Sequence, residues 1–220
     1  MFREDNPFWP GIRTGIPFGA AALLVGISFG VVAKPVMGTV APIAMSAFVF
    51  AGAAQFGATA VLASGGDALT AIAAGIMLNA RFLPMGIAIS RVLPGGPWRR
   101  AIEGQTVVDA SWAAAHQGGG VFDRHMLIGA TVPQYPMWVL GTAIGVFGAN
   151  WIGDPKALGL DAVFPAFFLG LLLPEATASR AARLAAMAGA VIAFALTPVL
   201  PAGLPILLAS LAAVIGLRVR

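Results

Sequence analysis

The sequence predicts an all-α, polytopic helical membrane protein with about seven transmembrane segments. Of its 220 residues, 59% are hydrophobic and only 10% are charged, whereas an ordinary soluble domain carries about 25% charged residues. Mean hydropathy is +0.88, and uncharged runs reach the roughly 18 residues that identify a transmembrane helix. Too little charge remains to cover a soluble globule, so we expect residues 1–220 to form one integral membrane domain.

Three segments are expected in the first half of the chain. Thr14 to Ala33 are twenty uncharged residues, which at about 1.5 Å per residue cover the roughly 30 Å hydrocarbon core. A second segment is expected near Ile43 to Ser64, because Pro35, Gly38 and Pro42 break the start of its uncharged run. A third runs from about Ala68 to Ser90.

Residues 91–125 are the only extended polar region, and we expect them to form a central cytoplasmic loop. Gly- and Pro-rich stretches bound this region on both sides, and between them Trp98 to Ala115 predicts one short helix at the membrane surface. Its expected apolar side carries Val107, Val108, Trp112 and Ala115.

The second half predicts four further segments. Met126 to Trp151 is long enough for a fourth span, whereas Ala162 to Pro174 has only thirteen residues, which is short for a fifth. Leu184 to Leu217 is a run of thirty-four uncharged residues broken between Pro198 and Pro205. This run predicts two short helices joined by a tight turn.

The distribution of Lys and Arg predicts an outside N-terminus and an inside C-terminus. Nine basic residues then face the cytoplasm and three face outside, as the positive-inside rule favours. The nine are Lys34, Arg91, Arg99, Arg100, Arg124, Arg180, Arg183, Arg218 and Arg220, and the three are Arg3, Arg13 and Lys156.

An internal repeat is also suggested. Phe29-Gly30, followed by Pro35 and Phe48, is echoed by Phe147-Gly148, followed by Pro155 and Phe168. Three-span units that begin at the first and fourth segments would have opposite directions in the predicted topology. Inverted repeats of this kind are common in secondary transporters.

Glycines form regular stripes on two of the expected spans. Gly15, Gly19, Gly26 and Gly30 share one face of the first segment, and Gly141 and Gly145 lie on the fourth. Small residues at such spacing let helix backbones approach closely. We therefore expect these stripes to serve internal helix packing, with dimerisation as the alternative.

The composition also argues against several functions. A net charge of +4 is expected from cytoplasmic loops, so we predict no nucleic-acid partner. Cysteine is absent, His116 and His125 are nine residues apart, and we predict no metal site and no cofactor. The hydrolase, metalloprotease and phosphate-loop motifs are missing, so we do not expect an enzyme.

Arg81 is the sharpest single feature, because it lies roughly 15 Å from the predicted cytoplasmic end of the third segment. An arginine at the centre of a membrane costs about 2.5 to 3.5 kcal/mol even on insertion scales, and such residues usually mark a ligand site or pathway. The predicted role is bidentate binding of an anionic group such as an amino-acid carboxylate. A structural ion pair or a snorkelling side chain is the alternative.

Further candidate substrate-binding residues are polar or small. Asn79 and Arg81 are two residues apart and can share one face only if the helix unwinds between them. Gln55, with Gly52 before it, lies among small residues that favour close packing or unwinding. For Asn79 and Gln55, interhelical hydrogen bonding is the alternative, and for Gly52 it is packing.

Three acidic residues are candidates for coupling or gating. Asp109 lies in the expected surface helix, whereas Asp161 and Glu175 flank the fifth segment. Either of these two could carry a coupling proton. A solvated acid or an ordinary boundary charge is the alternative.

Several motifs together resemble the AzlC-like branched-chain amino-acid exporters. They are Gly15-Ile-Pro-Phe-Gly19, Met45-Ser46, Phe50-Ala-Gly-Ala-Ala-Gln55-Phe56, Asn79-Ala-Arg81 and Gly159-Leu-Asp161, which occur in the family's order along most of the chain. The resemblance implies export of branched-chain amino acids, often with a small membrane subunit of the AzlD type.

These expectations combine into one hypothesis and one rival. The chain is expected to be a multi-pass secondary carrier of the cell inner (plasma) membrane that exports a small zwitterion by alternating access. The rival is a non-transporting membrane subunit that scaffolds a transport complex. A carrier predicts transport by the purified protein in liposomes, whereas a scaffold predicts none.

Overall fold

The computed structural model describes residues 7–152 and 159–200, with residues 205, 208–209 and 211–212. Within this part the chain forms ten helices and no strand, which confirms the all-α class. The helices are α1 (Phe8–Met37), α2 (Val40–Phe48), α3 (Gly52–Ala63), α4 (Ala68–Asn79), α5 (Phe82–Ile89), α6 (Pro97–Gly104), α7 (Asp109–Ala115), α8 (Arg124–Ile152), α9 (Leu160–Ala178) and α10 (Arg180–Leu196).

The chain divides into two compact units. Unit 1 consists of residues 1–51 and 82–163, and unit 2 of residues 52–81 and 164–220. The chain passes between the units at two helix interruptions, after Ala51 and after Arg81, and a third time within α9, after residue 163.

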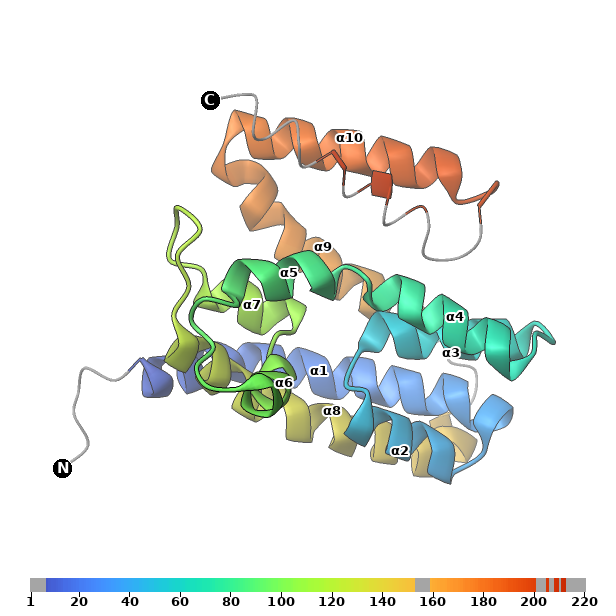
Figure 1. The fold of residues 1–220 in the computed structure, drawn as a ribbon. Coiled ribbons are helices and arrows are strands. Elements are labelled where there is room, and N and C mark those ends of the chain that lie inside the picture. The colour runs from blue at the N-terminus through green and yellow to red at the C-terminus, as the bar shows by residue number, and fades with distance from the viewer. Residues whose placement is uncertain (1–6, 153–158, 201–204, 206–207, 210, 213–220) are drawn as a thin grey trace. The chain divides into compact units, whose positions relative to one another are not determined.

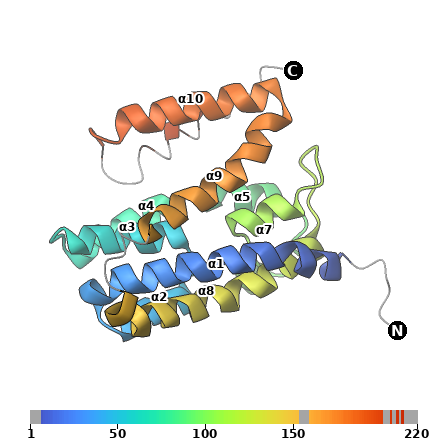
Figure 2. The ribbon, with the colours of Figure 1, turned by 180° about the vertical axis from the view of Figure 1, so that it is seen from behind.

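The central feature of unit 1 is the contact between α1 and α8, which lie side by side along their whole length (Figures 1 and 2). A Cβ atom on Gly11 would meet the carbonyl oxygen of Met126 at 2.8 Å, and one on Gly26 would meet that of Trp138 at 2.6 Å. Near the far end, Lys34 Nζ donates a hydrogen bond to Asn150 Oδ1, 3.4 Å away. The predicted packing role of the glycine stripes is confirmed, because only glycine leaves room for the facing backbone.

The same contacts show that α1 and α8 run in the same direction. Their partners advance together, from Gly11 beside Met126 to Lys34 beside Asn150. The prediction of oppositely directed repeats starting at the first and fourth segments is therefore wrong. Glycine stripes indicate close approach, but they do not encode the relative direction of two helices.

The predicted topology needs a related correction. The first turn of α1 packs against the first turn of α8, which directly follows the central loop. The start of α1 and this loop consequently lie at the same end of unit 1, and they cannot lie on opposite sides of a membrane.

Two expected spans are interrupted. The segment Ile43–Ser64 is divided into α2 and α3, and the segment Ala68–Ser90 into α4 and α5, with Ala80 and Arg81 between them. Asn79 is the last residue of α4, and Ala80 and Arg81 form a turn before α5; whether Asn79 and Arg81 share a site stays a prediction. The residues of the expected fourth segment form a single helix, α8, of 29 residues.

The central loop contains two helices rather than the single one predicted from Trp98 to Ala115. Helix α6 ends at Gly104, and the chain turns before α7 begins at Asp109. The predicted apolar side is largely confirmed, because Val107 and Ala115 are buried in a cluster that also contains Ile89, Leu93, Phe122 and Leu127, with Trp112 packed against it. Gly104 ends α6 because glycine has a low helix propensity.

In unit 2, α3 and α4 form a helical hairpin joined by a four-residue turn. Asp67 caps α4, since its carboxylate accepts hydrogen bonds of 2.9 Å from the backbone N–H and the hydroxyl of Thr70. The pKa of Asp67 is lowered below its ordinary value, mainly by the hydrogen bond from the backbone N–H of Thr70 and then by that from the Thr70 hydroxyl.

The seven-segment count stays a prediction. Among the described residues, α1 is long and apolar enough to cross a membrane, and α4 with α5 would add a second span if the interrupted pair is counted together. Helix α9, with 19 residues, is longer than the thirteen expected for the fifth segment. The seventh segment falls mostly outside the described residues.

Candidate functional site

The interruption between α2 and α3 lies at mid-depth of the α1–α8 pair. Phe50 adopts φ = +45°, a left-handed conformation that costs a non-glycine residue roughly 1–2 kcal/mol. Its ring packs edge-on against Tyr135 and Trp138, with centroids 5.2 and 6.5 Å away. Trp138 is the middle residue of α8. Aromatic packing thus holds a non-helical backbone segment near the centre of unit 1.

Two hydrogen bonds fasten the end of α2 to α8. The hydroxyl of Tyr135 donates to the carbonyl oxygen of Ala47 over 2.8 Å, and the hydroxyls of Ser46 and Thr142 are 2.8 Å apart. The last four carbonyls of a helix lack intrahelical partners. Tyr135 satisfies one of them, the carbonyl of Ala47.

A second polar cluster joins α7 to α8. Gln134 Nε2 donates a 2.9 Å hydrogen bond to Ser111 Oγ, which lies 2.7 Å from the hydroxyl of Thr131. All three side chains are buried. Because buried polar groups that satisfy one another fix a single arrangement, this cluster sets the position of α7 on α8.

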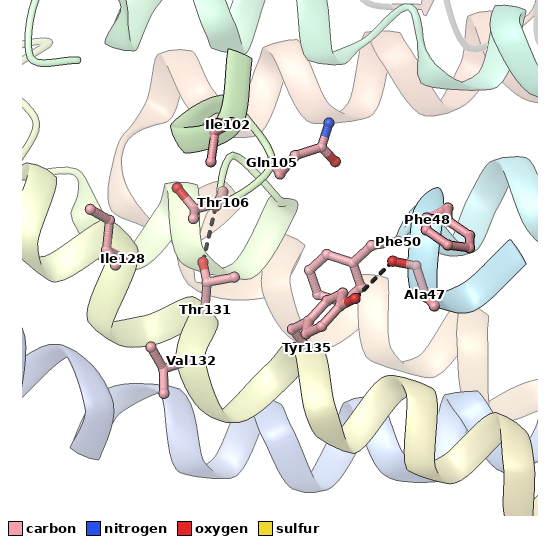
Figure 3. Close-up of a pocket in the computed structure, with 10 residues that line it drawn as sticks. All are labelled: Ala47, Phe48, Phe50, Ile102, Gln105, Thr106, Ile128, Thr131, Val132 and Tyr135. Atoms are coloured by element: carbon pink, nitrogen blue, oxygen red, sulfur yellow. Dashed lines mark hydrogen bonds between the residues drawn. The ribbon is translucent and has the colours of Figure 1, made fainter. Parts of the chain in front are cut away.

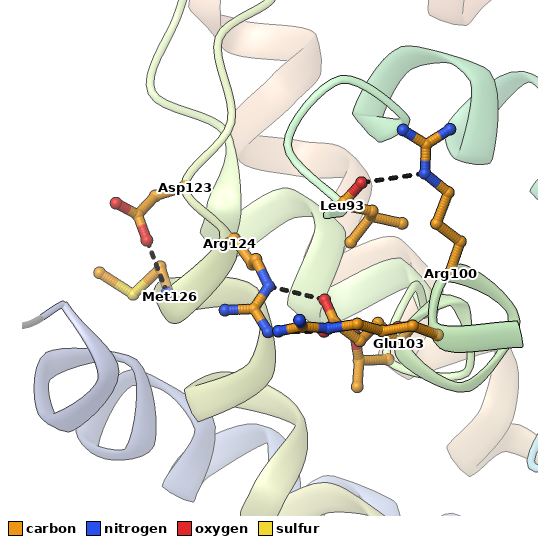
Figure 4. A network of polar contacts seen from close by, with 8 residues as sticks. Leu93, Arg100, Glu103, Asp123, Arg124 and Met126 are labelled. Carbon is orange, nitrogen blue, oxygen red and sulfur yellow. Dashed lines mark hydrogen bonds and ion pairs between the residues drawn. The ribbon is translucent and has the colours of Figure 1, made fainter. Parts of the chain in front are cut away.

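At the end of unit 1 where α8 starts, an ion-pair network joins α6 to α8 (Figure 4). Glu103 Oε2 accepts a 2.6 Å hydrogen bond from Arg124 Nε, and its Oε1 accepts a 2.9 Å bond from Arg99. The pKa of Glu103 is lowered from its ordinary 4.5 to about 2, mainly by the hydrogen bond from Arg124 and to a smaller extent by the hydrogen bond from Arg99. Arg100 donates a hydrogen bond to the carbonyl oxygen of Leu93 over 3.1 Å. Polar contacts therefore connect α6 both to α8 and to the segment that precedes α6.

Unit 2 brings the four predicted substrate-binding residues to one end of its hairpin. Gly52 begins α3 and Gln55 lies in its first turn, while Asn79 ends α4 and Arg81 follows it. The turn between the helices is at the opposite end. Gly57 faces Leu78 and Gly75 faces Ala54 across the hairpin, and the four-residue turn makes its two helices antiparallel.

The local environments of these side chains differ. Gln55 is fully buried. Asn79 Oδ1 is also buried, and no group in the described part of the chain donates a hydrogen bond to it. Arg81 is half-buried and donates a 2.9 Å hydrogen bond to the carbonyl oxygen of Leu78, which caps the C-terminal turn of α4.

The three candidate gating acids belong to two helices, α7 and α9. Asp109 is half-buried at the start of α7 in unit 1. Asp161 and Glu175 belong to α9, but their side chains fall outside the described part. The roles of all three residues stay predictions.

Several structurally prominent residues were not singled out from the sequence, above all Tyr135, Thr131 and Gln134. A signal was present, since residues 131, 134 and 135 are spaced to share one face of the fourth segment. Tyr135 is also the only tyrosine in the chain. Polar side chains that share one face of an apolar helix favour an interior polar contact.

The chain is similar to bacterial proteins that are named as membrane or transport proteins. The chain is 25% identical over 181 residues to the branched-chain amino acid transport protein AzlC of Bacillus subtilis, covering 78% of this chain and 70% of the relative. It is 26% identical over 176 residues to the inner membrane protein YgaZ of Escherichia coli, covering 76% and 72%.

A more distant relative is an uncharacterized membrane protein of Helicobacter pylori, 22% identical over 158 residues, with coverage of 70% of this chain and 68% of the relative. No solved structure is similar to the chain. The family model described as AzlC protein matches residues 17–152, which include most of α1 and all of α2 to α8. The chain is therefore a membrane protein that belongs to the AzlC family.

Proposed function

We propose that this protein is a multi-pass secondary carrier of the cell inner membrane that exports small zwitterionic amino acids, above all branched-chain ones, by alternating access. Family membership and the name of the Bacillus relative support amino-acid transport. The direction, the substrate and a small AzlD-type partner subunit belong to the proposal.

The observation that carries this proposal is the interruption between α4 and α5, with Asn79 on one side and Arg81 inside it. Non-helical backbone at membrane depth is tolerated where it is buried in protein or lines a cavity. In secondary transporters such interrupted helices commonly form the substrate site. Both side chains also belong to types that bind a zwitterion.

Arg81 is assigned to the substrate carboxylate. A guanidinium carries five N–H donors, so capping Leu78 and pairing with a carboxylate are compatible roles. Asn79 Oδ1 is assigned to the substrate ammonium group, because a buried acceptor without a donor costs about 1–3 kcal/mol. Gln55 and the first N–H groups of α3 at Gly52 complete the polar contacts.

The distribution of charge in unit 1 supports a new orientation. Five arginines lie at the end where α1 and α8 start, and Lys34 lies at the other end. The five, which define the arginine-rich end, are Arg13, Arg91, Arg99, Arg100 and Arg124. The positive-inside rule places this end in the cytoplasm.

The test is efflux of labelled leucine, isoleucine, valine and alanine from cells, and from liposomes that contain the purified protein. Arg81→Gln should reduce leucine efflux about 10- to 100-fold, because hydrogen bonds to charged groups contribute roughly 1.5–3 kcal/mol. Arg91→Gln is the matched control, since Arg91 is exposed in a loop.

Two results would contradict the proposal in different ways. Normal leucine efflux by a membrane-inserted Arg81→Gln variant would remove Arg81 from the site. No efflux of any amino acid by the wild-type protein, with and without a co-expressed small partner, would favour the scaffolding rival.

A further inference from the structure

Unit 1 contains a pocket of about 480 Å³ between the end of α2, the turn after α6 and the first half of α8 (Figure 3). This volume is within the range of roughly 300–1,000 Å³ that is typical of small-molecule sites. The lining residues are Ala47, Phe48, Phe50, Ile102, Gln105, Thr106, Ile128, Thr131, Val132 and Tyr135.

The lining suits an uncharged aliphatic group. It contains no ionisable side chain except the phenol of Tyr135, and most of its surface is apolar. The hydroxyls of Thr131 and Tyr135 already bond to the carbonyl oxygens of Thr106 and Ala47 over 3.0 and 2.8 Å. With these polar atoms satisfied, a ligand gains little from hydrogen bonds to them and more from burying apolar surface.

The pocket extends from one end of unit 1 to its middle. At one level, Ile102 and Gln105 flank Glu103, which is paired with Arg124 at the arginine-rich end. At the other level, Phe50 lies in the interruption between α2 and α3, beside Trp138 at the middle of α8. The pocket therefore runs from the arginine-rich end to the non-helical segment at mid-depth.

We propose that this pocket receives the aliphatic side chain of the transported amino acid as it enters from the arginine-rich end, and that Val132 and Ile128 set the size of the accepted side chain. The inference rests on the proposed amino-acid transport. All ten residues that line the pocket belong to unit 1.

Changing the size of residue 132 tests this assignment. Val132→Phe should fill part of the pocket and lower the leucine-to-alanine efflux ratio at least about 10-fold, because one methylene in an apolar pocket discriminates by roughly 10- to 200-fold. Val132→Ala should do the opposite and raise efflux of methionine and phenylalanine relative to leucine.

Leu140→Phe is the matched control. Leu140 lies on the same helix and is 48% exposed, compared with 46% for Val132, but it does not line the pocket. Its substrate ratios should equal those of the wild-type protein. Binding of leucine to each purified variant, measured as a rise in unfolding temperature, should follow the same order as efflux.

The possible failures are distinguishable. If the wild-type protein exports leucine but the Val132 variants keep its substrate ratios, the pocket assignment is overturned and the transport function stands. If Val132→Phe loses all efflux, the substrate ratios of Val132→Ala test the pocket instead. Wild-type ratios in that variant overturn the pocket assignment. If the wild-type protein neither binds nor moves any amino acid of the panel, the proposed function fails, and the pocket assignment fails with it.

Discussion

The hydroxyl of Tyr135 on α8 donates a hydrogen bond to the carbonyl oxygen of Ala47 on α2, 88 residues earlier in the chain and 2.8 Å away. This bond satisfies a carbonyl at the end of α2, just before the chain unwinds at mid-depth. It therefore links the wall of the pocket to the interruption between α2 and α3.

Tyr135→Phe should loosen this link while keeping the ring that packs against Phe50. A typical hydrogen bond contributes about 0.5–1.5 kcal/mol, so we expect a lower unfolding temperature in detergent and a severalfold slower leucine efflux. Tyr135→Ala should be worse, because it also removes the aromatic contact. Wild-type stability and efflux in Tyr135→Phe would show that the hydrogen bond does not hold α2.

Gly145→Ala should destabilise the contact between α1 and α8. An added Cβ atom would overlap the carbonyl oxygen of Ile27, a backbone atom that cannot move alone. Overpacking typically costs about 1–3 kcal/mol, which thermal unfolding of the purified protein should detect. Gly86→Ala is the control, since nothing lies within 4 Å of its added Cβ atom. Equal unfolding temperatures for the two variants would contradict the close packing.

The Glu103–Arg124 pair predicts a loss of stability in acid. The pKa of Glu103 is about 2 in the folded protein and 4.5 ordinarily, so its contribution is fully present above about pH 4.5 and disappears as the pH falls towards 2. Glu103→Gln should lower the unfolding temperature at pH 7. The difference between this variant and the wild-type protein should largely disappear near pH 2.

Arg99→Gln provides the comparison for this pair. The side chain of Arg99 is 59% exposed and that of Arg124 is 22% exposed, and exposed ion pairs contribute little. The Arg99 variant should therefore change stability less than Arg124→Gln. A difference between Glu103→Gln and the wild-type protein that does not depend on pH would exclude the ion pair as its cause.

Cysteine labelling should place the start of α1 and the central loop on the same side of the membrane. The chain has no cysteine, so single exposed cysteines can be introduced as Trp9→Cys, Val121→Cys and Thr39→Cys. A membrane-impermeant maleimide should label only the Thr39→Cys variant in intact cells, and the other two after lysis. Labelling of Trp9→Cys without Val121→Cys in intact cells would contradict the parallel arrangement of α1 and α8.

The sequence by itself determined the class of the protein, the main helices and the family. Apolar runs such as Thr14–Ala33 predict helices that are now seen, because apolar side chains and internal backbone hydrogen bonds both favour helices in lipid. The local chemistry also pointed to Arg81 and Asn79, and it required an unwound helix if they were to share a site. The structure ends α4 at Asn79 and begins α5 at Phe82, so the helix is interrupted at these residues.

The tertiary structure alone decided how these segments are combined. Neither Ala80-Arg81 nor Val49-Phe-Ala51 contains a strong helix breaker, yet both interrupt the helices. At Phe50, contacts with Tyr135 and Trp138 offset the strain. The parallel direction of α1 and α8 was likewise decided by contacts between residues more than 110 positions apart. Local sequence determines which face of a helix carries small or polar residues. The helix that packs on that face, and the direction in which it runs, depend on residues far away in the sequence.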